Sequence, residues 1–502
     1  MSMEVGISFT PNWIVEETKT ADLGDARLNK RLGNVLEMLN RKPTESIPAA
    51  SRGWNETKAA YRFFDNPDVT GEKILQPHKE ATIERMRKEP IILLPQDTTE
   101  LDYSSKPETK GLGKLSFERQ LGMLLHPTIA FTSDRVCLGV VDSQILIREE
   151  LRRKDNLHLL PIIAYSLGNQ DYQMLCLCIK LTKILRKPTQ AELPIEQKES
   201  IRWINGYRVA QELAKQLSES KIISIADREG DIYEIFIEAS KVKAEGHAEF
   251  IIRGNQDRKL ATEENIKEHT KLKKKIGNAP VIGTVEFTLP PAKNRKARKV
   301  EQEIRSASVE LRAPYRPDRK LPNVIINVVL AREINAPHGV EPIEWLLLTS
   351  LPVNTAERAI QIITWYLCRW QIEIFFRILK SGCAVEELQL QTMDRLKPCL
   401  ALYMIIAWRI LHMTMLGRSC SKILCTAVFE DEEWHAVYRV TYRCPPPIVP
   451  PNLNRIIKMV AGLGGFLNRK NDGFPGAQTI WLGLQRTRDF VIAMEALDAS
   501  RK

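Results

Sequence analysis

The stretch YLCRWQIEIFFRILK, residues 366–380, decides how the rest of the chain is interpreted. Its apolar residues recur at helical spacing. At about 100° per residue, one face of that helix collects a phenol, three cations and a carboxylate: Tyr366, Arg369, Glu373, Arg377 and Lys380. Glu373 lies four residues from two of the arginines, so a solvated, salt-bridged face explains this pattern as readily as a binding site does.

The residues before this stretch predict a long helix that follows a strand. Asn354 and Glu357 form a capping-box pattern, which predicts one helix over residues 354–380. The apolar run at residues 345–350 predicts the strand before it.

Farther upstream, strand and helix patterns alternate, which is typical of a mixed α/β sheet. Strands are predicted at residues 91–94, 122–132, 136–147, 221–226 and 249–253, and helices at 199–218 and 231–244. Residues 256–343 interrupt the alternation with β-type runs at 280–289, 300–311 and 323–331. We interpret that segment as a β insertion.

Both ends of the chain have helical patterns. Near the start, five apolar residues repeat at helical spacing: Leu28, Leu32, Val35, Leu36 and Leu39. A second helix is predicted at residues 55–64. Residues 391–502 are mostly helical, with breaks at 445–451 and 462–465. The run 399–416 approaches membrane length but contains Arg409, and an arginine at mid-span costs about 2.5–3.5 kcal/mol. We therefore predict a buried core helix there.

Composition indicates a folded protein of several domains. The 502 residues are 43% apolar and 27% charged, which excludes a disordered or collagenous chain. The net charge is +11, and residues 256–320 carry 17 Lys/Arg against 9 Asp/Glu. The densest run, residues 293–299, is either a solvated loop or an edge that contacts phosphates.

The nine cysteines, Cys176 and Cys178 included, show no disulfide framework and no zinc spacing, which fits a reducing cytosol.

Two acidic residues stand at the ends of predicted strands. Asp97 follows one apolar strand and precedes two threonines, and Asp227 follows another. A turn or a helix cap explains either residue alone. If both met Glu373, each pair would repel by about 4 kcal/mol at 4 Å and an effective dielectric constant of 20, so cations would have to lie between them. All-oxygen ligands favour Mg²⁺ or Mn²⁺, and a pair of such ions can promote phosphodiester transfer.

The motifs together resemble the DD(E) cut-and-paste transposases of the insertion-sequence-four family. The spacing Tyr-x2-Arg-x3-Glu-x6-Lys, from residue 366 to residue 380, matches that family's signature. The segments at 97–99 (DTT), 227–231 (DREGD) and 345–350 (WLLLTS) are similar to its catalytic motifs and to the strand before the signature. Residues 23–27 (LGDAR) and 60–63 (AYRF) look like its amino-terminal head, and 463–466 (LGGF) with Trp481 looks like its carboxy-terminal region.

This resemblance implies the fold class and the domains. It implies an α/β protein with a ribonuclease-H-like catalytic core and a β-strand insertion, flanked by an N-terminal helical DNA-binding head and a C-terminal helical region. We place the DNA-end-binding domain at residues 1–70, the catalytic domain at 71–390 with its insertion at 256–343, and the dimerisation region at 391–502. Tyr233 departs from the family pattern, which has a histidine there.

The resemblance also implies the site residues. The catalytic residues and ligands of two Mg²⁺ ions, for which Mn²⁺ substitutes, are Asp97, Asp227 and Glu373. The residues expected to contact phosphates are Tyr366, Arg369 and Lys380, with Arg377 beside them. A flipped base is expected to stack on Trp345, with Arg253 nearby. The candidates for recognising end DNA in the head are Arg27, Lys30, Arg31 and Arg62.

The implied reaction proceeds by strand hydrolysis at each element end, hairpin formation, hairpin opening and joining to target DNA. The expected partners are double-stranded DNA, both transposon ends and target, and a second copy of the chain in a synaptic homodimer. No membrane is expected, and the expected location is the bacterial cytoplasm at the nucleoid. Two alternatives remain: a defective copy that binds ends without cutting, and a general ribonuclease-H-like nuclease. The latter leaves the head and the tail unexplained.

Overall fold

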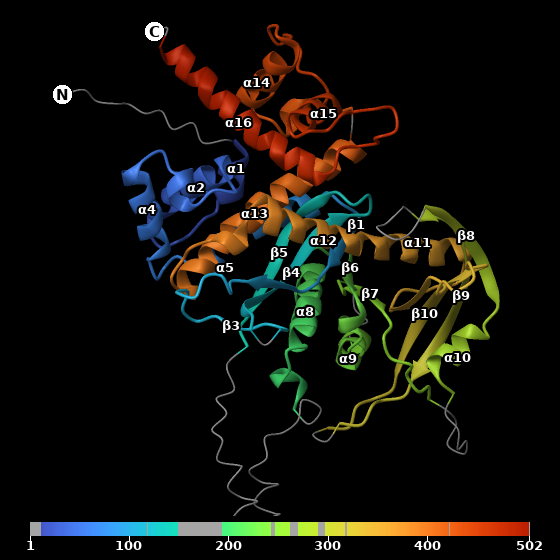
Figure 1. The fold of residues 1–502 in the computed structure, drawn as a ribbon. Coiled ribbons are helices and arrows are strands. Elements are labelled where there is room, and N and C mark those ends of the chain that lie inside the picture. The colour runs from blue at the N-terminus through green and yellow to red at the C-terminus, as the bar shows by residue number, and fades with distance from the viewer. Residues whose placement is uncertain are drawn as a thin grey trace, which may run out of the picture.

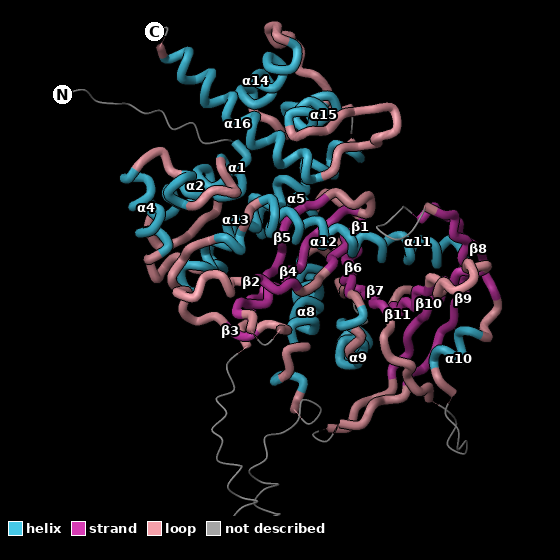
Figure 2. Tube along the Cα trace, in the orientation of Figure 1, coloured by secondary structure: helices cyan, strands magenta, loops and turns pink. Residues whose placement is uncertain are grey.

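A central sheet surrounded by helices forms the molecule, with the head on one side, the C-terminal helices above and the insertion strands on the other side (Figures 1 and 2). The computed structural model describes residues 12–117, 119–148, 193–241, 246–261, 270–289, 297–316, 319–420 and 422–500. Cys176, Cys178 and residues 293–296 of the basic run lie outside these ranges.

The core of the sheet has the strand order of a ribonuclease-H-like fold. β1 (Ile91–Pro95) pairs antiparallel with β4 (Leu121–Thr132), and β4 pairs antiparallel with β5 (Cys137–Leu146). On its other side, β1 pairs in parallel with β6 (Lys221–Ala226), which pairs in parallel with β7 (Glu249–Arg253). Two short strands, β2 (Thr99–Asp102) and β3 (Gly113–Lys114), also pair with β4. The predicted α/β fold class is therefore confirmed.

The predicted β insertion continues this same sheet instead of forming a separate one. The added strands are β8 (Val281–Leu289), β9 (Arg298–Leu311) and β10 (Val324–Ile334), with the short helix α10 (Leu272–Gly277) between β7 and β8. They join the core through β11 (Glu344–Thr349), which lies antiparallel between β10 and β7. The order from β1 onward is β1-β6-β7-β11-β10-β9-β8.

The sheet separates two hydrophobic cores, because alternate residues of a strand point to opposite faces. Ile92 and Leu94 pack in the core that holds α8 (Ile201–Gln216) and α9 (Tyr233–Lys241). Leu93 packs in the core that holds α13 (Met393–Ser419). The helix α5 (Gly71–Met86) contacts both β5 and α13. Because both faces are covered, the inner strands are apolar runs and not alternating ones.

The long apolar helix α13 is a core helix, as predicted. Within the described residues it is the one helix long and apolar enough to span a membrane, and 89% of its most apolar window is buried in the protein. Its Arg409 is buried but pairs with Glu433 at 3.3 Å and lies over the ring of Trp13.

The N-terminal helices form the compact head that the sequence predicts. They are α1 (Asn12–Thr18), α2 (Ala26–Arg41), α3 (Ile47–Ala50) and α4 (Trp54–Phe64). The side chain of Asp25 caps α2, and that helix buries its predicted apolar face, which includes Leu32, Val35, Leu36 and Leu39. Both α2 and α4 pack on α13.

The C-terminal helices pack against one another and against the head. They are α14 (Asp431–Tyr442), α15 (Leu453–Leu463) and α16 (Ala477–Ala499), and the breaks between them fall at the predicted segments. From α16, Arg488 donates to Asn40 Oδ1 at 2.8 Å, and Gln485 donates to Thr44 at 3.0 Å. These contacts between tail and head join segments that are more than 400 residues apart.

The prediction of one continuous helix over residues 354–380, capped by Asn354, is wrong. Its first part, α11 (Ala356–Tyr366), is capped by Thr355, whose side chain accepts a hydrogen bond from the backbone N–H of Arg358. A 3₁₀ turn at Leu367–Arg369 precedes α12 (Trp370–Arg377), and a π turn at Ile378–Gly382 follows it. The wider π turn shifts Lys380 from the position that an unbroken α-helix would give it.

Candidate active site

Two of the predicted acidic residues lie at one edge of the sheet because their strands are parallel neighbours in register. Pro95 at the end of β1 pairs with Ile225 of β6. Asp97 and Asp227 each follow two residues beyond that pair, at the carboxyl ends of the two strands. In α/β sheets this edge is where ligands bind. The side chains cap local turns as well: Asp97 Oδ1 accepts from Thr98 N at 2.8 Å, and Asp227 Oδ1 accepts from Glu229 N at 2.9 Å.

The third acidic residue, Glu373 on α12, reaches this edge through an arginine. Arg369 Nη1 donates to Asp97 Oδ2 at 2.9 Å, and Arg369 Nη2 donates to Glu373 Oε1 at 2.8 Å. One guanidinium therefore bridges two of the predicted metal ligands. Among the described residues, no group of three or more His, Cys, Asp or Glu side chains is arranged as a ready metal site.

The charges at this edge act on one another. Burial raises the pKa of Asp97 to about 6, and the charge of Asp227 adds to the rise. The Thr98 N–H and Arg369 oppose the shift, and Glu373 adds to it. The charges of Asp227 and Glu373 thus both disfavour ionisation of Asp97.

Arg202 was missed by sequence reasoning, although it joins the two strand-end motifs. From α8, its Nε donates to Thr98 Oγ1 at 2.8 Å and its Nη2 donates to Glu229 Oε2 at 2.7 Å. Its side chain is 9% exposed. Thr98 Oγ1 also contacts His126 Nδ1 at 2.8 Å, so this network is anchored in the core. The sequence carries no local signal for Arg202, because its partners come from separate segments.

The remaining residues of the signature divide into three environments. Tyr366 is buried beside Arg369, and burial raises the pKa of its phenol, while Arg369 and Arg253 oppose that shift. Lys380 donates to the carbonyl of Glu100 and pairs with Glu386 at 3.3 Å. Arg377 is exposed on α12. The structure therefore brings Tyr366, Arg369 and Glu373 together and directs Lys380 toward β2.

Trp345 and Arg253 lie on adjacent strands, β11 and β7. The ring of Trp345 stacks on Phe287 of β8, with centroids 5.9 Å apart and planes inclined by 12°. Arg253 Nη2 donates to the carbonyl of Glu344 at 3.4 Å. Phe287 had no distinguishing signal in the sequence, because β10 and β9 lie between β11 and β8 in the sheet order and pairing does not predict this contact.

The four predicted DNA contacts of the head are all exposed. Arg27, Lys30 and Arg31 lie on α2, and Arg62 lies on α4. They are on a different unit from the acidic residues, so any contact that they make with DNA is separate from the cleavage site.

Part of the basic segment lines a groove of about 930 Å³ near the second acidic motif. Its cationic lining is Arg258, Lys259, Arg312, Arg316, Arg319 and Lys320. Arg258 is fixed by Asp231, to which its Nε donates at 3.1 Å, and Arg316 is paired with Glu234 at 2.9 Å. None of these residues belongs to the run 293–299, so the groove does not test whether that run is a solvated loop or an edge that contacts phosphates.

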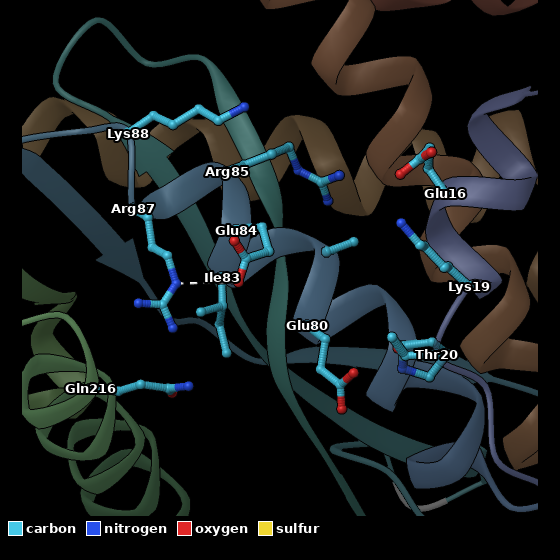
Figure 3. A pocket seen from close by; sticks show the side chains of 12 residues that line it. Glu16, Lys19, Thr20, Glu80, Ile83, Glu84, Arg85, Arg87, Lys88 and Gln216 are labelled. Carbon is cyan, nitrogen blue, oxygen red and sulfur yellow. Dashed lines mark hydrogen bonds and ion pairs between the residues drawn. The ribbon is translucent and has the colours of Figure 1, made fainter.

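A second pocket, of about 490 Å³, lies between α1, α5 and α8 and contains none of the predicted site residues (Figure 3). Its lining mixes both charges, and Arg87 pairs with Glu84 there at 3.2 Å. We assign no function to this pocket.

Comparisons with known proteins place the chain in a family. Three family models match in order along the chain: transposase DNA-binding at residues 10–69, transposase DDE domain at 206–408, and transposase Tn5 dimerisation domain at 405–499. The chain belongs to the DDE transposases, a class of DNA-transposing enzymes. Within that class it is Tn5-like, since it combines the DDE domain with the Tn5 dimerisation domain. DNA as partner, dimer formation and the use of divalent ions are general to proteins with these domains.

A solved structure of piggyBac transposase, a synaptic complex with hairpin DNA, also matches the chain. Sequence identity is 8% and the TM-score is 0.29, which is too low to carry an argument. The match covers 70% of this chain and 52% of that chain, so this chain spans about half the length of that relative.

The raised pKa of Asp97 predicts a pH-dependent effect of Asp97→Asn on stability. The pKa is about 6 in the folded protein and about 3.9 in an unfolded chain, so ionising Asp97 costs folding free energy once the pH rises through that window. In metal-free buffer, Asp97→Asn should therefore unfold at a higher temperature than wild type at pH 7.5. The difference should shrink below pH 6 and vanish near pH 4. A difference that is constant across this range would contradict the assignment.

The Arg202 network predicts a loss of cutting without a loss of DNA binding. Arg202→Ala should slow metal-dependent nicking by about 10–100-fold, the usual effect of removing a group that orients metal ligands. Binding of end DNA, measured by gel shift, should stay within about two-fold, because Arg202 is buried. Arg202→Lys keeps the charge and should restore part of the rate. If binding and nicking fall together, Arg202 is a general stability residue.

Proposed function

We propose that this chain is an active transposase that binds the inverted-repeat ends of its own mobile element and moves that element to new DNA. It hydrolyses one strand at each end, forms and opens a hairpin, and joins the freed 3′-OH to target DNA. The observation that carries the proposal is the placement of Asp97 and Asp227 at the ends of neighbouring parallel strands, with Arg369 bridging Asp97 to Glu373. The three family matches along the chain support it.

The donor set fits two Mg²⁺ ions, or Mn²⁺ in their place. The candidate ligands are the carboxylates of Asp97, Asp227 and Glu373, and hard divalent cations prefer oxygen ligands. When bound, such ions would lower the pKa of the attacking water or 3′-OH and would stabilise the leaving oxygen. The raised pKa of Asp97 means that this carboxylate gains from a nearby cation.

The cations and the phenol around the carboxylates would hold the DNA backbone. Arg369 and Tyr366 lie beside the carboxylates, and Lys380 and Arg377 are farther along the same segment. Trp345 would stack on a flipped base, with Arg253 holding the adjacent phosphate. The basic groove near Asp231 and the exposed cations of the head would extend the DNA contact away from the cleavage point.

The working assembly would be a synaptic homodimer on two transposon ends, with each protomer cutting the end held by the other. The match to a Tn5 dimerisation domain over residues 405–499 supports dimer formation. The site of action would be the bacterial cytoplasm, at the nucleoid. A copy that binds ends without cutting is the alternative, and the cleavage assay below decides between them.

Glu373→Gln tests the catalytic assignment. In a plasmid carrying the gene with its native flanks, the wild type should excise the element when Mg²⁺ is present. Glu373→Gln should reduce nicking to the level of the metal-free reaction, because a neutral amide is a poor ligand for a hard cation. It should still shift end DNA on a gel.

Glu387→Gln is the matched control, since Glu387 is exposed, pairs with Lys106 and lies outside the proposed site. It should cut like wild type. Cutting by Glu373→Gln would disprove the third ligand. Binding without cutting by the wild type, even with Mn²⁺, would favour the non-catalytic copy.

Trp345→Ala tests the flipped-base assignment. Stacking on an aromatic ring is worth about 1–3 kcal/mol per base, so hairpin formation should fall by about 5–150-fold, and first-strand nicking and end binding should change far less. Trp345→Phe keeps a ring and should recover most of the hairpin yield. Equal loss of both steps would instead show that Trp345 only supports the packing of β11 on β8.

A further inference from the structure

Arg369 holds a position that the proposed metal ions would also need. Its guanidinium donates to Asp97 Oδ2 at 2.9 Å and to Glu373 Oε1 at 2.8 Å. These are oxygens of two of the three carboxylates proposed as metal ligands. An arginine that is paired in this way keeps a single positive charge between them, since it stays protonated in proteins.

The surroundings of Arg369 leave its hydrogen bonding incomplete. The side chain is 8% exposed, and its Nε is buried with no hydrogen-bond partner. The guanidinium lies 4.9 Å from the ring centroid of Trp370, within the range of a cation–π contact. The residue ends the 3₁₀ turn between α11 and α12, at an interruption of the helix. Interruptions of this kind often mark functional hinges.

We propose that Arg369 is an internal counter-cation that occupies the space between Asp97 and Glu373 until DNA arrives, and that a DNA phosphate then draws it away. The inference rests on the proposed function, because it assumes that these carboxylates are the metal ligands. It adds that loading of divalent ions is coupled to DNA binding through one side chain.

The coupling follows from competition for the same oxygens. A guanidinium and a divalent cation are both positive, so they repel one another when they share a carboxylate pair. A phosphate offers Arg369 two oxygens on one group, in place of one oxygen from each of two separate carboxylates. Binding free energies are reciprocal, so DNA that removes Arg369 raises the affinity for metal by the factor by which metal raises the affinity for DNA.

The first test is a calorimetric titration of Mn²⁺ into the full-length protein without DNA. Arg369→Ala should bind Mn²⁺ at least ten-fold more tightly than wild type, since the competing cation is gone. Arg369→Lys keeps the charge but not the two-oxygen geometry and should be intermediate. Arg208→Ala removes the same charge from a surface ion pair with Glu238, outside the proposed site, and should match wild type. If Arg369→Ala binds Mn²⁺ no better than wild type, the proposal is overturned.

The second test adds an end duplex that already terminates in its 3′-OH, so that no strand remains to be hydrolysed. Saturating duplex should raise the Mn²⁺ affinity of the wild type at least ten-fold. In Arg369→Ala the duplex should raise it less than two-fold. An equal rise in both proteins would show that the coupling runs through other residues and would refute the role of Arg369.

Thermal unfolding checks that the variants fold and gives an independent readout. Without metal, Arg369→Ala should melt below wild type, because Asp97 and Glu373 lose their counter-cation. Saturating Mg²⁺ should raise its melting temperature more than that of the wild type, as tighter binding to the folded state requires. If Arg369→Ala does not fold, Arg369→Gln, which removes the charge but keeps a polar N–H donor, replaces it in the titrations.

The outcomes for Arg369 and for the proposed function are separable. The Mn²⁺ titrations need no DNA cleavage, so a wild-type protein that never nicks DNA but shows the expected affinities refutes the activity alone. A protein that nicks normally while Arg369→Ala leaves Mn²⁺ affinity unchanged refutes the counter-cation alone.

Discussion

The parallel pairing of β1 with β6 is the constraint on which the site depends. Because Pro95 and Ile225 are paired, the two strands end level with one another, and Asp97 and Asp227 emerge side by side. A slip of one residue would point one of the two side chains to the opposite face of the sheet. Both strands are apolar runs, and their two faces are buried against α8 and α13.

Like charges brought together in this way need a compensating cation, and the protein supplies one from its own chain. Arg369 neutralises part of the charge of Asp97 and Glu373 while Arg202 holds the loops after β1 and β6 at a fixed separation. Each arginine has one exposed partner, since Glu373 is 43% exposed and Glu229 is 62% exposed. The other partner of Arg202, Thr98, is held by His126 in the core.

The strands were predictable because each is a short apolar run bounded by turns, and the predicted bounds of β6 and β7 agree with the structure. The cap at Thr355 and the π turn around Lys380 were not, since the capping-box pattern favours Asn354, which has Glu357 three residues on, and a π turn depends on tertiary packing. Asp97, Asp227 and Glu373 could be selected from strand ends and helix spacing. Their proximity could not, and neither could Arg202, because both depend on contacts between distant segments.

In this structure, the residues proposed to contact DNA already contact protein groups that are chemically similar to the DNA groups they would bind. Arg369 pairs with carboxylates, Lys380 pairs with Glu386, and Trp345 stacks on Phe287. Phosphate oxygens and a base ring would offer equivalent contacts. Such partners keep long side chains ordered before binding, which lowers the entropy lost when DNA binds. Each DNA contact must then replace an existing contact within the protein. The net free energy of DNA binding is therefore less favourable for a duplex that fits poorly than for one that contacts all three residues together.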